Sequence, residues 1–374
     1  MKLYSRESGK ISKWWLSLDH NIIFSFVLIL LCGVMMSLSS SPYVAERIGL
    51  GASYFYSKHI IFVVLCLAVA IFFSTLDSTL ILRFSLLGLL IFLFLVFVVL
   101  LTEGQLKGAK RWLKIFGFSM QPSEFLKPFF IVINAWFLTR KFVRSDFNGY
   151  AISVALFGLV ITGLVLQPDI GMTLSFSAVW AAQIFLSGIP FYVILILLFI
   201  GIGGIVSAYF IFGHVRYRID MFLFSDGSPT YQVRKSLEAI DSGGLLGTGI
   251  FEGKVKMVLP DSHTDFVFAV MMEELGILVT FAVLFLYFFM IFRIFVNIKY
   301  AQNNFTKVLL VGIAVQIAFQ VFVNVGVNMN LLPTKGTTLP LISYGGSSML
   351  AMGILVGILL AFCKDQYGML KKKL

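Results

Sequence analysis

Ten long runs of apolar residues divide most of the chain, and each is close to the length of a membrane-spanning helix. A spanning α-helix needs about 20 mainly apolar residues to cross the hydrocarbon layer of a bilayer. The pattern therefore predicts an all-α polytopic membrane protein with about ten transmembrane helices, forming a single integral membrane domain over residues 1–374. The expected spans are 20–38, 59–75, 80–101, 124–139, 149–166, 171–188, 190–213, 265–292, 307–330 and 347–363.

The distribution of basic residues predicts the orientation of these spans. Ten spans place both termini on one side, and loops rich in Lys and Arg face the cytoplasm. Basic residues cluster at the N-terminus, at 140–144, at 293–299 and at 364–373, so we expect both termini in the cytoplasm and the large loop 214–264 outside. The segment 102–123 is also basic but falls outside. It indicates either an error in this topology or a functional basic surface, and we favour the surface.

Composition agrees with a bilayer as the solvent of this chain. Hydrophobic residues make up 59% and charged residues 13%, against about 25% charged residues in soluble domains. The net charge of +11 would suggest a nucleic-acid partner for a soluble protein. Here the basic residues lie at the ends of apolar runs, so we expect no nucleic-acid binding. Cys32, Cys66 and Cys363 have no metal-ligand spacing and are predicted to be core residues.

Polar residues at membrane depth are costly and usually mark function, and four segments carry them. In the first, Glu124 and Lys127 have the i,i+3 spacing of an ion pair on the first turn of a helix. The pair either neutralises a capped helix or belongs to a headgroup site in which Lys110 and Arg111 face phosphate. In the second, Asp169 either caps the next helix or lies in an internal polar cavity.

The third segment, 259–269, is a dense polar group at a predicted membrane boundary. Ser262 and Asp265 have nearly the spacing of a helix capping box, which is a structural explanation for this aspartate. Glu273 and Glu274 follow two to three turns deeper, where capping does not explain them. The fourth segment, 324–348, is rich in Pro and Gly and must be buried in protein or line a cavity.

These four segments, in this order, resemble the SEDS family of cell-wall membrane proteins, the FtsW, RodA and SpoVE type. The resemblance extends from Asp19 to about Phe362, and the stretch Thr334-Lys335-Gly336 is most similar to the division-type FtsW members. It is carried by Gln-Pro-Ser-Glu at 121–124, Gln-Pro-Asp-Ile-Gly at 167–171, Leu-Pro-Asp-Ser-His-Thr-Asp-Phe at 259–266 and Leu-Pro-Leu-Ile-Ser-Tyr-Gly-Gly-Ser-Ser at 339–348.

The resemblance implies a glycosyltransferase that polymerises lipid II, an undecaprenyl-diphosphate-linked disaccharide peptide, into the glycan strands of peptidoglycan. It places this activity on the outer face of the bacterial inner membrane, at the division septum. It implies as partners a class B penicillin-binding protein of the FtsI type, other divisome proteins and membrane lipids. Two other functions stay open: a lipid II flippase, and a non-catalytic divisome scaffold.

The implied reaction inverts a sugar that carries a diphosphate leaving group, so it needs a base for the acceptor hydroxyl and cations for the diphosphate. The resemblance assigns the functional aspartate to Asp265, our expected catalytic base. Mg or Mn can also supply positive charge, although the sequence offers no dedicated set of metal ligands, and no other cofactor is implied. The residues expected to bind substrate or shape the site are Lys110, Arg111, Gln121, Ser123, Glu124, Lys127, Asp169, Arg218, Gln232, Ser242, Lys256, His263, Thr264, Glu274, Lys335 and Ser343.

Overall fold

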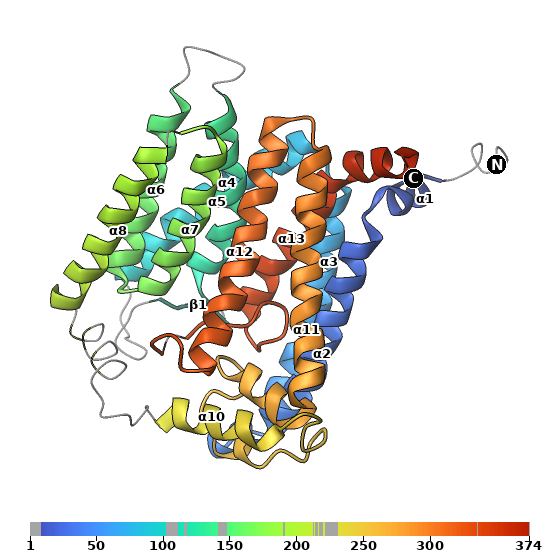
Figure 1. The fold of residues 1–374 in the computed structure, drawn as a ribbon, viewed down its shortest axis with the longest axis vertical. Helices are drawn as coiled ribbons and strands as arrows, with labels where there is room; N and C mark the ends of the chain where they lie inside the picture. Colours follow the sequence, from blue (N-terminus) through green and yellow to red (C-terminus); the bar gives the residue numbers. More distant parts are fainter. Residues whose placement is uncertain are drawn as a thin grey trace.

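The fold is a bundle of helices, and its first and last described helices contact each other toward one end of the bundle (Figure 1). The computed structural model describes residues 9–101, 111–115, 118–140, 148–189, 191–211, 213, 216, 220, 231–334 and 336–373. The elements are α1 (Lys10–Ser17), α2 (His20–Arg47), α3 (Tyr54–Thr75), α4 (Ser78–Leu101), β1 (Leu113–Ile115), β2 (Phe118–Met120), α5 (Pro122–Arg140), α6 (Gly149–Leu166), α7 (Ile170–Leu186), α8 (Phe191–Ile211), α10 (Tyr231–Gly243), the 3₁₀ turn η1 (Val255–Met257), α11 (Val267–Tyr300), α12 (Asn304–Asn328) and α13 (Gly346–Lys373).

Each of the ten predicted spans lies on a helix of the described chain. Seven of these helices, α2, α3, α4, α6, α11, α12 and α13, are long and apolar enough to cross a membrane. The other three predicted spans correspond to α5, which carries Glu124 and Lys127, to the 17-residue α7, and to α8. The helices alternate in direction along the chain, so each polar turn lies at one of two ends. We call the end where α11 begins the Asp265 end.

The interior of the bundle contains polar contacts that join its helices. α5 is buried over most of its length and contacts α4, α6, α7, α12 and α13. From α5, Asn134 donates a hydrogen bond to Gln183 of α7 at 2.8 Å and accepts one from Ser153 of α6 at 2.6 Å. Such side-chain bonds favour helix association in lipid, where apolar surface alone gives little driving force.

The predicted outer loop 214–264 contains a helix that the apolar pattern did not reveal. α10 lies across the Asp265 end of the bundle (Figure 1) and contacts α11 and α12. We call residues 231–266 the α10 segment. α2 extends past its predicted end at residue 38 to Arg47, because its last turns pack against η1 of this segment.

A break in α11 attaches the α10 segment to the bundle. Gly276 has φ 72° and ψ 179°, a conformation that favours glycine, and it interrupts the helical backbone. The loop after α10 lies against the break: Ile277 N–H donates to the Gly244 carbonyl at 3.0 Å, and Thr248 N–H donates to the Glu273 carbonyl at 2.9 Å. A Cβ atom at Gly276 would lie 2.2 Å from the Gly247 nitrogen. The break and the loop therefore form one unit.

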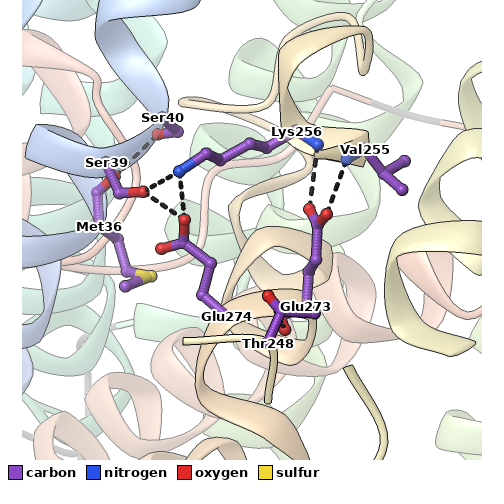
Figure 2. Close-up of polar contacts among 8 residues, drawn as sticks. All are labelled: Met36, Ser39, Ser40, Thr248, Val255, Lys256, Glu273 and Glu274. Atoms are coloured by element: carbon purple, nitrogen blue, oxygen red, sulfur yellow. Dashed lines mark hydrogen bonds and ion pairs between the residues drawn. The ribbon is translucent and has the colours of Figure 1, made fainter. Parts of the chain in front are cut away.

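Two adjacent buried glutamates beside the break, Glu273 and Glu274, bind residues of the α10 segment (Figure 2). The Glu273 carboxylate accepts the backbone N–H groups of Val255 and Lys256 at 2.7 and 2.9 Å. Glu274 forms an ion pair with the Lys256 ammonium, and both contact Ser39 of α2. The Lys256 and Glu274 side chains are fully buried, so Lys256, expected to bind substrate phosphate, is instead enclosed in the protein.

We predict that Lys256→Met strongly destabilises the protein, because it leaves the buried Glu274 carboxylate without its cation. Breaking a buried ion pair in this way costs about 3–5 kcal/mol. Thermal unfolding in detergent measures the effect. The double variant Lys256→Met/Glu274→Gln removes both charges and should recover most of the lost melting temperature. A single variant that melts like the unmodified chain would contradict the prediction.

Candidate active site at the Asp265 end

The four polar segments singled out in the sequence meet at the Asp265 end of the bundle. One set of contacts, which we call the Arg111 group, joins Arg111, Gln121 and Asp169. Asp169 caps α7 by accepting the Met172 N–H at 3.2 Å. The same carboxylate lies 3.5 Å from the Arg111 guanidinium and accepts from the Gln121 side chain at 3.3 Å. Arg111 also donates to the Pro168 carbonyl at 2.6 Å. Asp169 is therefore both a helix cap and the centre of a polar group.

One turn into α5, the predicted ion pair is present and buried. Lys127 Nζ lies 2.6 Å from Glu124 Oε2, and the two side chains are 4% and 9% exposed. α5 begins at Pro122, so Glu124 lies in the first turn, where the helix dipole stabilises negative charge. Ser123 is buried beside this pair, and its hydroxyl has no hydrogen-bond partner. Three polar side chains of one helical turn are thus held inside the bundle.

Asp265 lies two residues before the first residue of α11 and is partly exposed. The capping-box prediction is wrong, because α11 begins at Val267 and its N-cap residue, Phe266, has no side-chain cap bond. The Asp265 backbone carbonyl accepts hydrogen bonds from Asn324 and Asn328 of α12, both at 3.0 Å. Its carboxylate lies beside Gly336, where a Cβ atom would be 2.8 Å from Oδ2. The backbone is held by α12, and the carboxylate faces the loop before α13.

Aromatic rings pack around His263, two residues before Asp265, on the side of α3. The His263 ring lies 4.8 Å from Phe55 and 5.4 Å from Tyr344, and Tyr344 lies 6.2 Å from His59, measured between ring centroids. His59 is fully buried with no partner for either ring nitrogen, and His263 Nδ1 also has none. Burial lowers the pKa of His263 to about 4, while the nearby Asp261 acts in the opposite direction. His263 is therefore neutral at neutral pH.

The loop before α13 connects Asp265 to the Arg111 group. Ser343 donates to the Thr264 carbonyl at 2.5 Å and accepts from Leu339 N–H at 2.8 Å. At the start of α13, Ser347 accepts the Gln121 N–H at 3.0 Å. Leu341 in this loop has φ 67°, a conformation that costs energy for a branched residue and is common near functional sites.

The remaining predicted residues differ in what they contact. Gln232 of α10 donates to Asp261 at 3.4 Å, and Thr264 donates to the Asp261 carbonyl at 3.2 Å. The Ser242 hydroxyl bonds to the Ala239 carbonyl of its own helix. Glu274 is enclosed with Lys256, away from the exposed part of the site. Lys110, Arg218 and Lys335 lie outside the described residues.

Sequence reasoning missed two contributors to this site. His59 is a single histidine in an apolar helix, and only the packing of α3 shows that its ring lies beside Tyr344, which also packs against His263. Asn324 and Asn328 fall in the fourth polar segment, and their i,i+4 spacing on α12 was the available signal for a shared target. Among the described residues, no group of three or more His, Cys, Asp or Glu side chains is placed to hold a metal ion.

Comparison with known proteins identifies the family of this chain. The family model of the FtsW, RodA and SpoVE cell cycle proteins matches residues 19–367. A probable peptidoglycan glycosyltransferase FtsW of Caulobacter vibrioides is 34% identical over 356 residues, which cover 95% of this chain and 91% of that protein. A protein of the same name from Geobacter sulfurreducens is 38% identical, over 74% of this chain and 75% of that protein.

Solved structures share the fold over nearly the whole length. A chain in a peptidoglycan synthase complex that coordinates polymerization and crosslinking superposes with a TM-score of 0.77 and 26% identity, covering 94% of this chain and 99% of that one. The rod shape determining protein RodA of Thermus thermophilus has a TM-score of 0.70 and 25% identity at the same coverage. The predicted all-α polytopic membrane fold is confirmed, and the chain belongs to the FtsW/RodA/SpoVE (SEDS) family, as a member of the FtsW type.

Proposed function

We propose that this protein is a peptidoglycan glycosyltransferase that polymerises lipid II, with Asp265 as the catalytic base. The observation that carries the proposal is the position of Asp265: a partly exposed carboxylate on a backbone fixed by two asparagines. It lies at the same end of the bundle as the cationic side chains of Arg111 and Lys127. The names of the relatives support the same activity.

The reaction requires one substitution at the anomeric carbon of the donor sugar. The Asp265 carboxylate takes the proton of the acceptor hydroxyl as that oxygen attacks the carbon. The bond from this carbon to the diphosphate oxygen breaks, and its electron pair leaves with the diphosphate. One such displacement converts an α-linked donor into a β-linked product, so no covalent sugar–enzyme intermediate is needed. A positioned general base contributes about 10²–10⁴-fold to such a step.

The leaving diphosphate needs positive charge, and Arg111 is the best placed described residue to provide it. Its side chain is 24% exposed, whereas Lys127 is 4% exposed and lies against Glu124. Arginine has five N–H donors in a fixed plane, so its contacts with Asp169 and Pro168 leave donors for phosphate oxygens. Asp169 keeps Arg111 in position, and the buried Glu124–Lys127 pair shapes the site.

The orientation and partner follow from the same proposal. Basic residues gather at the end of the bundle opposite Asp265, and by the positive-inside rule this supports a cytoplasmic position for that end and for both termini. The Asp265 end then faces outward, where the glycan is built, in the bacterial inner membrane at the division septum. The partner is a class B penicillin-binding protein, which crosslinks the strands. The similar chain in a synthase complex that couples the two activities supports this partner.

We predict that Asp265→Asn reduces glycan synthesis from lipid II by about 10²–10⁴-fold, because the amide cannot accept the hydroxyl proton. The measurement is polymer formation by the purified protein with its class B partner, with folding checked by thermal unfolding. Asp241→Asn, which changes an exposed carboxylate of α10, is the matched control and should retain activity. Full polymerisation by Asp265→Asn, or headgroup translocation in liposomes with no glycan product, contradicts the proposal.

We predict that Arg111→Gln raises the KM for lipid II at least about tenfold, because a hydrogen bond to a charged group contributes about 1.5–3 kcal/mol. The variant also leaves Asp169 without its cation. Arg111→Gln/Asp169→Asn removes that unpaired charge and keeps a helix cap, so it should restore stability but not substrate affinity. Arg83→Gln, at an exposed position at the opposite end, is the control. A normal KM in the double variant would show that Arg111 serves only Asp169.

We predict that acidification destabilises the protein partly through His263. Its pKa is lowered to about 4 in the folded state, whereas an unfolded histidine titrates near 6.5. Between these values the unfolded chain binds more protons, so the free energy of unfolding falls as the pH is lowered. The melting temperature of His263→Gln should fall less steeply from pH 7 to pH 4.5. Parallel curves for the two proteins would refute this role.

A further inference from the structure

A patch of exposed apolar side chains lies on the loop that fills the break in α11. Leu245 is 65% exposed and Leu246 is 80% exposed. Ile250 and Phe251, on the same loop, are 44% and 48% exposed. No residue from Ser242 to Phe251 is charged. Large apolar side chains this exposed on a segment without charge need an apolar neighbour.

This patch is continuous with the lipid-facing side of α11. Leu278 N–H donates to the Leu245 carbonyl at 3.2 Å, so the loop runs beside the first turn after the break. Leu278 is itself 59% exposed, and Phe281 and Phe285 follow on the same face at 59% and 60%. The leucines of the loop therefore lie next to side chains that must face hydrocarbon.

The length of α11 places the break at the membrane boundary. From Ile277 to Tyr300 the helix is roughly 36 Å long at about 1.5 Å per residue. The hydrocarbon core of a bilayer is roughly 30 Å thick. A helix of this length spans the core and leaves each end close to an interface. The loop, paired with residues 277 and 278, lies at that interface.

The backbone polar groups of the loop are hydrogen-bonded within the protein, as non-helical backbone near lipid requires. Backbone polar groups are costly there unless they are bonded within the protein. The N–H groups of Gly247, Thr248 and Gly249 donate to the carbonyls of Gly243, Glu273 and Glu274 at 2.8, 2.9 and 3.2 Å. The carbonyls of Gly244 and Leu245 accept from residues 277 and 278 at 3.0 and 3.2 Å. The backbone of the loop therefore bonds mainly to α11, and its apolar side chains remain exposed and can contact lipid.

We propose that loop 244–251 is a membrane anchor whose apolar side chains, led by Leu245 and Leu246, insert into the bilayer leaflet at the Asp265 end. The occupant of the patch is lipid, because the patch extends the lipid-facing side of α11 and carries no charge that would suit a polar partner. Resting on the proposed function, the anchor fixes the height of the α10 segment, and with it Asp265, relative to a lipid-borne diphosphate.

The test is the depth of a fluorescent label in lipid vesicles. The full chain carrying Leu246→Cys is labelled with an environment-sensitive fluorophore, in a Cys32→Ala background because Cys66 and Cys363 are buried. Nitroxide-bearing lipid should quench this label more than aqueous iodide does. The matched control is Glu238→Cys, whose glutamate side chain is 50% exposed on α10, and it should show the opposite order. Adding Leu245→Asn should shift the Leu246 label toward iodide quenching.

Each outcome decides the proposal without reference to enzyme activity. Equal iodide quenching at positions 246 and 238 would overturn it, as would shielding of the label only after a class B penicillin-binding protein is added. Thermal unfolding of the Leu245→Asn variant in detergent is the control for folding. Because Leu245 is exposed, the melting temperature should not change, and altered quenching then reports lost insertion and not a loss of structure. Loss of the polymerase proposal alone would leave the depth measurement unaffected.

Discussion

At Gly276, α11 stops being a continuous helix, and the backbone groups released there bond to the loop that follows α10. The arrangement of the whole Asp265 end depends on this exchange of hydrogen bonds. It requires glycine at Gly276, whose conformation and close approach to Gly247 exclude a side chain. It also places Glu273 and Glu274 beside the gap, where their carboxylates bind the backbone and the side chain of the α10 segment. A polar segment is thereby fixed rigidly to a membrane bundle.

Charges at this end of the protein have two different roles. Lys256 and Glu274 are fully buried and compensate each other, so their effect is on where the α10 segment lies. Arg111 keeps partial exposure while it contacts Asp169, and Asp265 keeps partial exposure while its backbone is bonded to α12. Buried pairs cost desolvation energy and give rigidity, whereas exposed groups retain the capacity to bind a substrate. Only the burial of each side chain distinguishes the charges that position the α10 segment from those that can bind a substrate.

Much of this site was predictable from the residues alone. The Glu124–Lys127 pair and the Asp169 cap both follow from local spacing, because i,i+3 contacts and N-caps are decided within one turn of helix. Predictions that depended on distant segments did less well. Lys256 was expected to face phosphate but is enclosed with Glu274 of α11 and with Ser39 of α2, which is far away in the sequence. Asp265 was given a capping alternative that fails, because α11 starts two residues later.

The sequence by itself determined the membrane fold, since runs of about 20 apolar residues are stable as helices in lipid whatever they pack against. It also determined the family, because its motifs and their spacing are local strings. Only the tertiary structure decided which polar groups share a site and which are enclosed, because burial and pairing depend on contacts between helices that the chain order does not encode. The placement of His59 beside Tyr344, and of Leu246 beside the lipid-facing side of α11, arises in the same way.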